Sequence, residues 1–306
     1  MTAPNAKLRT PDRPGPGPLP EVLLRSLDLA VRRRVEGMLA GDHRSSVLGR
    51  GTELAQVRAY VPGDDVRRIE WNVTARTGEP HVRVDLAERV LVTWIVLDGS
   101  ASMVFGTAER RKADVAEGVC LALGHLASRR GNRLGVVAFG GARQTAVPPR
   151  QGRTGMLSLL LALREEPPMA GAGDGTLADG LHLVGRLAQQ RALVAVVSDF
   201  RGPRDWRPAL LRLAGGHDVI AIEVRDPREE TLPSVGELRL VDPETGRQLR
   251  VNTRDKRLRE RFATAAAAER AEVRGELGAL GVGHVVVSTE GDWLRNVAGF
   301  LRRGAL

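Results

Sequence analysis

Short apolar runs alternate with longer segments of helical character over the C-terminal two thirds of the chain. Strand-length apolar runs fill residues 90–97, 133–139, 192–199, 218–224 and 282–288. Segments with the length and composition of helices occupy residues 108–130, 154–164, 176–190, 205–214, 254–280 and 293–303. Alternation of buried strands and helices is typical of a parallel sheet with helices on its faces. The pattern therefore predicts an α/β fold over residues 90–306.

A different pattern interrupts this alternation near residues 236–252. Residues 237–242 and 247–251 alternate between apolar and polar positions on either side of the turn sequence Pro243-Glu244-Thr245-Gly246. A period of two around such a turn predicts a β-hairpin. We expect this hairpin to be an insertion that lies at an edge of the sheet.

The N-terminal part of the chain has a separate character. Residues 1–20 are rich in proline and glycine and contain no apolar core of a signal peptide, which predicts a disordered tail. A helix is predicted over about 21–39, within a distinct N-terminal region spanning 21–89. The longest apolar runs are far shorter than the roughly 20 residues that a membrane helix needs. We therefore expect no membrane span and a cytoplasmic location.

Oxygen-bearing side chains stand at the ends of the predicted strands. Asp98, Ser100 and Ser102 directly follow the first apolar run, and Asp199 ends the run at 192–199. Thr176 follows a glycine-rich turn at the start of a predicted helix. In a parallel sheet, loops at the carboxyl ends of the strands converge on one ligand site. Hard oxygen donors favour Mg²⁺ or Mn²⁺ over Zn²⁺.

Each part of this pattern also has a purely structural interpretation. An Asp-x-Ser-x-Ser sequence occurs in turns and helix caps. Thr176-Leu177-Ala178-Asp179 has the sequence of an N-cap followed by an acidic N3 residue, and Thr176 can cap a helix and bind a metal at once. The metal prediction depends on all five residues occurring in order at strand or helix ends.

These five residues together resemble the metal-ion-dependent adhesion site of von Willebrand factor A domains. Residue types, order and strand context all match: Asp98, Ser100, Ser102, Thr176 and Asp199. The resemblance implies a von Willebrand A-like, Rossmann-like sheet in which the two serines and the threonine hold the metal. It also implies that the aspartates act directly or through water, and that an acidic side chain of a partner protein fills one open position.

The segment before the first strand carries a second signature. It contains Arg58-Ala59-Tyr60, Pro62-Gly63-Asp64-Asp65, Ile69-Glu70-Trp71 and Ala75-Arg76. This series resembles the bacterial DUF58 family, whose members carry such a series just before a von Willebrand A-like domain. Leu54 stands where an aromatic residue is usual, and Glu70 replaces an aspartate. The resemblance is dense over residues 43–200 and implies a partner, a MoxR-type AAA+ ATPase, in chaperone-like complex maturation.

The signature segment has two interpretations that the sequence leaves open. It mixes opposite charges with aromatic residues: Arg58, Tyr60, Asp64, Asp65, Arg67, Trp71 and Arg76. One interpretation is a structural network of ion pairs that joins the segment to the α/β domain. The other is a surface on which a partner protein docks.

The charge of the chain raises a third class of function. The formal net charge is +9, and the basic residues are three lysines and 43 arginines. Such a surface could bind nucleic acid or an anionic membrane. Aromatic residues make up 3% of the chain, which leaves few side chains for base stacking. Nucleic-acid binding is therefore kept as an alternative and not as the main hypothesis.

An enzymatic function is the other alternative. Phosphohydrolases of the haloacid dehalogenase type place an aspartate at the end of the first strand and a second carboxylate two residues later. Here the second position is Ser100, which cannot donate and recover a proton near neutral pH. The sequence therefore favours a non-enzymatic, metal-dependent module for protein–protein interaction over a metal-dependent phosphohydrolase.

Overall fold

The structure is a computed structural model that describes residues 11, 15–25, 27, 53–86, 92–127, 132–163 and 173–303 of the chain. The chain divides into two compact units. One is Met38–Val90, and the other combines Met1–Gly37 with Leu91–Leu306. The helix predicted over 21–39 is helical at residues 21–25 and 27, and its other positions lie outside the described residues.

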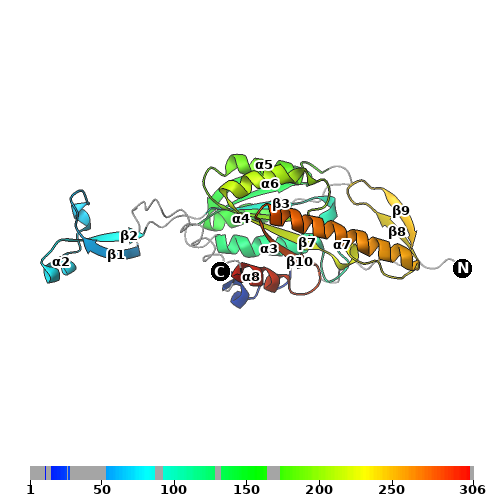
Figure 1. The fold of residues 1–306 in the computed structure, drawn as a ribbon, viewed down its shortest axis with the longest axis horizontal. Helices are drawn as coiled ribbons and strands as arrows, with labels where there is room; N and C mark the ends of the chain where they lie inside the picture. Colours follow the sequence, from blue (N-terminus) through cyan, green and yellow to red (C-terminus); the bar gives the residue numbers. More distant parts are fainter. Residues whose placement is uncertain are drawn as a thin grey trace. The chain divides into compact units, whose positions relative to one another are not determined.

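Six strands of the larger unit form one sheet in the order β10-β7-β6-β3-β4-β5 (Figure 1). Their bounds are β3 (Val92–Asp98), β4 (Arg133–Phe139), β5 (Thr145–Gln151), β6 (Leu193–Ser198), β7 (Asp218–Arg225) and β10 (Gly283–Ser288). All neighbours are parallel except β4 and β5, which are antiparallel. The predicted α/β fold with a parallel sheet is confirmed. Strand β5 was not predicted, because Pro148 and Pro149 are tolerated only at a sheet edge.

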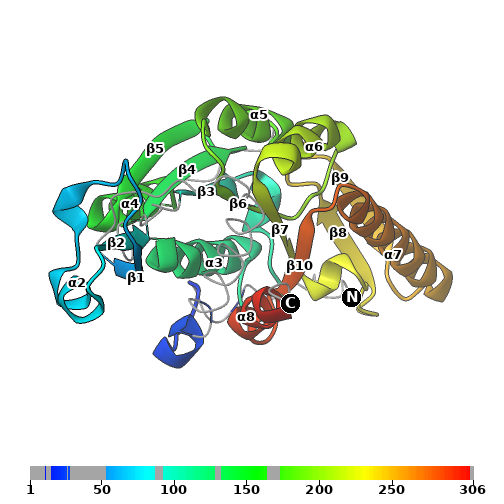
Figure 2. The same ribbon diagram turned by 60° about the vertical axis from the view of Figure 1, so that its left-hand side comes forward.

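Helices cover both faces of this sheet, as Figure 2 shows. They are α3 (Lys112–Ala127), α4 (Gly152–Leu163), α5 (Leu177–Leu187), α6 (Arg207–Gly216), α7 (Lys256–Ala279) and α8 (Trp293–Arg303). Side chains from α5, α6 and α7 join alternate residues of the central strands, among them Trp94 and Val96, in one buried cluster. Helices α3, α4 and α8 lie on the opposite face. Among the described helices, none is both long and apolar enough to span a bilayer.

The strand order reverses between β3 and β6. Strand β3 pairs with β4 on one side and with β6 on the other, in both cases in parallel. The loops that leave β3 and β6 at their carboxyl ends therefore turn away from each other and leave a crevice, the usual ligand position in open α/β sheets. Asp98 ends β3, and Asp199 follows β6 directly.

The predicted hairpin forms, but not at an edge of the main sheet. Strands β8 (Glu237–Val241) and β9 (Gln248–Asn252) pair only with each other, in antiparallel register. The two edges of the main sheet belong to β5 and β10, so the predicted edge position is wrong. Leu238 is buried, whereas most other side chains of the two strands are exposed. The hairpin is thus held to the domain by few apolar contacts.

The smaller unit is built on a second antiparallel pair. Strands β1 (Glu53–Ala59) and β2 (His81–Leu86) pair from Glu53 with Leu86 to Ala59 with His81. Between them lie a 3₁₀ turn, η1 (Val66–Arg68), and the short helix α2 (Trp71–Thr77). Helix α2 ends at Gly78, whose φ of 76° is a left-handed conformation that glycine adopts without strain.

Part of the predicted N-terminal tail contacts the larger unit. The N–H of Gly15 donates to Asp114 of α3 at 3.0 Å, and the indole N–H of Trp293 donates to the carbonyl of Pro16 at 3.1 Å. The composition of residues 1–20 predicts disorder, which stays a prediction, and α3 and α8 offer polar partners to Gly15 and Pro16. Residues 1–10 and 12–14 lie outside the described residues.

Asp226 directly follows β7 and connects this end of the strand to the segments that carry Thr107 and Thr289. The side chain is fully buried and accepts hydrogen bonds from the N–H and hydroxyl of Thr107, at 2.7 and 2.6 Å, and from the hydroxyl of Thr289 at 2.7 Å. Burial disfavours the carboxylate, but these hydrogen bonds outweigh burial and hold the pKa of Asp226 below its usual value. Because the pKa of Asp226 is lower in the folded chain than in the unfolded chain, its carboxylate stabilises the fold at pH values above the unfolded pKa. This stabilisation is lost as the pH falls through the folded pKa.

We expect Asp226→Asn to lower the free energy of unfolding by about 2–4 kcal/mol at pH 7, because the amide presents N–H groups to donors. The difference from the wild type should shrink below about pH 4, where the aspartate protonates in the unfolded chain. Urea denaturation at pH 7 and below about pH 4 measures the loss of stability and its decrease at low pH. Asp205→Asn, at an exposed position, is the control. Equal stabilities of wild type and Asp226→Asn at pH 7 would contradict this role.

Candidate metal centre

Asp98 lies at the carboxyl end of β3 and is nearly completely buried. One carboxylate oxygen accepts the N–H of Ser100 at 2.9 Å, and the other accepts the hydroxyl of Ser198 at 2.5 Å. Burial and the negative charge of Asp199 raise the pKa of Asp98 to about 6. Among the described residues, Asp98 contacts hydroxyl and amide donors and no cationic side chain.

The two serines of the loop after β3 face each other. Ser100 Oγ and Ser102 Oγ are 3.0 Å apart, and the Ser102 hydroxyl also hydrogen-bonds to Asp199. Gly140, with φ of 71°, lies against Ser100, and a Cβ atom there would come within 3.0 Å of the Ser100 side chain. Asp98, Ser100, Ser102 and Asp199 therefore form one connected polar group at the crevice between β3 and β6.

Thr176 has the capping role that its sequence allows. Its hydroxyl accepts the Asp179 N–H at 3.2 Å and its own N–H donates to the Asp179 carboxylate at 2.8 Å, which makes a capping box at the start of α5. The Thr176 hydroxyl also donates to this carboxylate at 2.9 Å. The preceding loop is tied to Gly140, whose N–H donates to the carbonyl of Asp174 at 2.7 Å. This loop thus reaches the neighbourhood of Ser100, while the Thr176 hydroxyl is engaged with Asp179.

A buried lysine belongs to the site although sequence reasoning did not single it out. Lys112 Nζ, on α3, donates to Asp199 at 2.6 Å and to Glu229 at 2.7 Å, and its side chain is fully buried. Burial opposes the charged ammonium, but Asp199 and Glu229 outweigh burial and raise the pKa of Lys112. Asp199 shows the matching behaviour, since Lys112 overcomes the effect of burial and lowers its pKa. Lys112 thus neutralises Asp199 and leaves Asp98 without a counter-ion.

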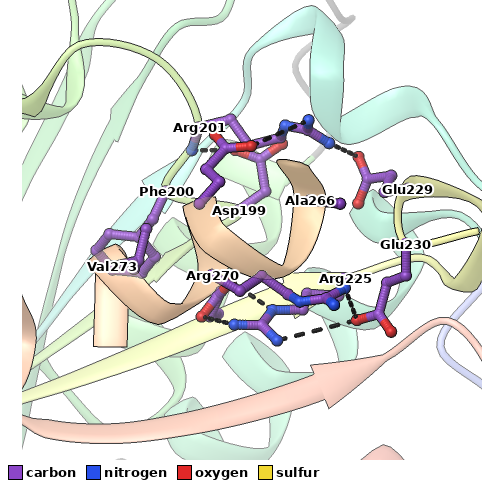
Figure 3. Close-up of a pocket in the computed structure, with 11 residues that line it drawn as sticks. Asp199, Phe200, Arg201, Arg225, Glu229, Glu230, Ala266, Arg270 and Val273 are labelled. Atoms are coloured by element: carbon purple, nitrogen blue, oxygen red, sulfur yellow. Dashed lines mark hydrogen bonds and ion pairs between the residues drawn. The ribbon is translucent and has the colours of Figure 1, made fainter. Parts of the chain in front are cut away.

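Asp199 also lines a charged pocket (Figure 3). Arg201 donates its backbone N–H to Asp199 at 3.1 Å, and its guanidinium pairs with Glu229 at 3.0 Å. Arg270, which lines the same pocket, pairs with Glu230 at 2.7 Å. Arginines and glutamates are therefore interleaved here, which differs from the continuous basic face that a nucleic-acid binder presents.

The donor set fits a hard divalent cation. Buried Asp98, next to a second carboxylate, lacks a counter-ion, and two hydroxyl oxygens lie beside it. Within the described parts of the chain, no group of three or more His, Cys, Asp and Glu side chains is arranged to hold a metal. A site dominated by hydroxyl oxygens suits Mg²⁺ or Mn²⁺ and is poor for Zn²⁺. Asp98, Ser100 and Ser102 are the residues that would hold such an ion, with Asp199 behind Ser102.

The charged residues of the signature segment form local pairs. Arg58 binds Asp64 through two hydrogen bonds of 2.7 Å, and Asp64 also accepts the N–H of Val61 at 2.9 Å. Asp65 caps η1 by accepting the N–H of Arg67. These contacts stabilise turns within the smaller unit.

Other residues of the signature are available to a partner. Trp71 is 69% exposed, Tyr60 is half-buried, and Arg67 and Arg76 are exposed. The ion pairs that the described residues of the signature segment form lie within the smaller unit and do not join it to the α/β domain. Docking of a partner on the exposed residues stays a prediction.

Comparison with known proteins identifies relatives over most of the chain. A profile of the family described as "Protein of unknown function DUF58" matches residues 56–272. Uncharacterized proteins of Mycobacterium tuberculosis and Mycobacterium bovis are each 42% identical over 286 residues, which cover 92% of this chain and 90% of the relative.

Solved structures with a similar arrangement have low sequence identity. The conserved hypothetical protein BatB from Bacteroides thetaiotaomicron is 15% identical, with a TM-score of 0.46, over 70% of this chain and 98% of that chain. A von Willebrand factor type A protein from Catenulispora acidiphila is 14% identical, with a TM-score of 0.39, over 74% of this chain and 43% of that chain.

We expect Lys112→Met to lower the free energy of unfolding by about 3–5 kcal/mol, because Asp199 and Glu229 lose their shared buried cation. The control is Lys256→Met, which removes an exposed pair with Glu260 and should cost less than about 1 kcal/mol. Urea denaturation at pH 7 measures both variants. A Lys112→Met protein as stable as the control would show that the buried pair does not hold these loops together.

Proposed function

The chain belongs to the DUF58 family, and we propose that within this family it is a metal-dependent module for protein–protein interaction without enzymatic activity. The observation that carries this proposal is the group formed by Asp98, Ser100 and Ser102 at the crevice of the sheet, with one buried carboxylate lacking a counter-ion. Asp98, Ser100 and Ser102 would hold Mg²⁺ or Mn²⁺, which would supply the positive charge that an acidic side chain of a partner binds. The protein's own residues fix the two aspartates: Ser198 and the Ser100 N–H hold Asp98, and Lys112 holds Asp199.

We propose a MoxR-type AAA+ ATPase as the partner, in a cytoplasmic, chaperone-like role. Membership of the DUF58 family supports this choice, because the resemblance to that family is what implies a MoxR-type partner. The exposed Trp71, Arg67 and Arg76 of the signature segment offer a second contact surface for the partner.

The phosphohydrolase alternative needs, two residues after the strand-end aspartate, a carboxylic acid that exchanges a proton with the leaving group. That position is Ser100, and the hydroxyls of Ser100 and Ser102 are each engaged with a neighbouring residue of the group. The carboxylates nearby are engaged as well, Asp199 with Lys112 and Glu244 with the Ser102 N–H. Neither hydroxyl exchanges protons near neutral pH. We therefore expect no hydrolysis of p-nitrophenyl phosphate in Mg²⁺ above the level of the Ser100→Ala/Ser102→Ala variant.

Metal binding is expected to depend on the two serines and to favour Mn²⁺ or Mg²⁺ at millimolar concentration over Zn²⁺. The double variant Ser100→Ala/Ser102→Ala should lose this binding and the accompanying rise in melting temperature. Its stability without metal should change by less than about 1 kcal/mol, because no core cavity opens. Ser158→Ala, which removes an exposed hydroxyl of α4, is the matched control. Calorimetry and thermal melting with each ion make the comparison. Unchanged Mn²⁺ binding in the double variant would exclude this site.

Partner binding is tested at constant Mg²⁺, because a chelator would also inactivate an ATPase. The purified MoxR-type ATPase of the same organism should bind the wild type and Ser158→Ala alike. The double serine variant and Asp98→Asn should dissociate at least about tenfold faster, since the short-range contact to the metal is lost. Biolayer interferometry measures these rates. Equal rates for all variants would contradict the metal mechanism, and no binding by the wild type would contradict the choice of partner.

A further inference from the structure

The turn of the β8–β9 hairpin is an ordered structure that presents one acidic side chain. Asp242 accepts the N–H of Glu244 at 2.9 Å and the hydroxyl of Thr245 at 2.6 Å, and its own N–H donates to the carbonyl of Arg247 at 2.9 Å. These bonds fix the turn. Glu244 takes part in the turn through its backbone, so its side chain is free to reach outward.

The Glu244 side chain reaches the candidate metal centre. Its Oε1 accepts the backbone N–H of Ser102 at 2.8 Å, across a separation of 142 residues in the chain. The other side of the turn faces the second aspartate loop. The hydroxyl of Thr245 contributes most to a lowered pKa of Asp242, and the positive charge of Arg201, two residues after Asp199, contributes as well. The turn therefore lies within reach of both loops that form the centre.

The rest of the hairpin is attached weakly to the domain. It pairs with no strand of the main sheet and lies beside α7 in Figures 1 and 2. An exposed two-stranded hairpin has little stability of its own and opens more easily than the core of a domain. A contact at its tip can thus be exchanged without unfolding the sheet.

We propose that Glu244 is a built-in acidic occupant of the metal centre, which the acidic side chain of a partner must displace. This inference rests on the proposed function. The Ser102 N–H lies in the same loop as the two hydroxyls, and the described residues give Glu244 no cationic partner. A carboxylate delivered there by the chain itself has the same chemistry as the carboxylate of a partner.

The proposal also defines the partner. An intramolecular ligand acts at a high effective concentration, so a weak external carboxylate competes with it poorly. The partner must therefore carry an aspartate or glutamate on an exposed turn and add contacts elsewhere. An external carboxylate binds only to molecules with an open hairpin. The apparent affinity is therefore reduced in proportion to the fraction of such molecules.

The experiment uses the full chain with Mn²⁺ as the metal and acetate as the carboxylate probe. Bound Mn²⁺ speeds the ¹³C relaxation of any acetate that reaches it. In Glu244→Ala the relaxation of acetate per bound Mn²⁺ should rise at least about threefold over the wild type, because the competing carboxylate is gone. Glu244→Gln, which keeps the size of the side chain without its charge, should give an intermediate value. Glu237→Ala, at an exposed acid of the same hairpin, should match the wild type.

A second measurement needs no metal. Hydrogen exchange of the segments 98–105 and 237–252 should be faster in Glu244→Ala than in Glu237→Ala, because the bond to the Ser102 N–H is lost. Unchanged exchange, or equal acetate relaxation in Glu244→Ala and the wild type while Mn²⁺ binds to both, overturns the role of Glu244 alone. Failure of the wild type to bind Mn²⁺ overturns the proposed function and this role with it.

Discussion

The buried ion pair between Lys112 and Asp199 determines the electrostatics of the whole crevice. It places a permanent positive charge beside one of the two aspartates that the sheet brings together, at 2.6 Å. Lys112 also binds Glu229, so that α3, the loop after β6 and the turn after β7 share one cation. Because a buried charge without a partner is very unfavourable, these three segments are held in a fixed arrangement. The remaining aspartate, Asp98, has no cationic partner among the described residues, so an added cation would bring it new attraction.

The sequence predicts the parts of this site that are local. Each central strand is a run of apolar residues because it is buried on both faces, so its end, and with it Asp98 or Asp199, can be located from the pattern alone. The Thr176 cap is equally local, since its partner Asp179 is three residues away. The family signature adds turns such as that of Asp64 with Arg58, which also join near neighbours.

The residues that sequence reasoning missed act across long separations. Lys112 is 87 residues from Asp199, and Glu244 is 142 residues from Ser102. A lysine at the start of a predicted helix looks like an ordinary surface residue, and a glutamate in a hairpin turn does too. The one signal that could have pointed to Lys112 is the rarity of lysine, since the chain has two other lysines among its 46 basic residues. Strand β5 was hidden for another reason: its prolines oppose strand formation everywhere except at an edge, and pattern alone does not reveal edges.

Asp98 and Glu244 both bind the loop that carries the two serine hydroxyls. Asp98 binds the N–H of Ser100, and Glu244 binds the N–H of Ser102, so both carboxylates are oriented by backbone donors of the same short loop. Among the described residues neither carboxylate has a cationic partner. Asp98 also lies beside the negative charge of Asp199, and a divalent cation among the hydroxyls of this loop would offset the repulsion between these two aspartates. Release of Glu244 would remove one negative charge from beside the ion, and the acidic side chain of a partner would then replace that charge. In the proposed mechanism, the same electrostatic balance that favours metal binding would therefore couple the metal, the hairpin and the partner.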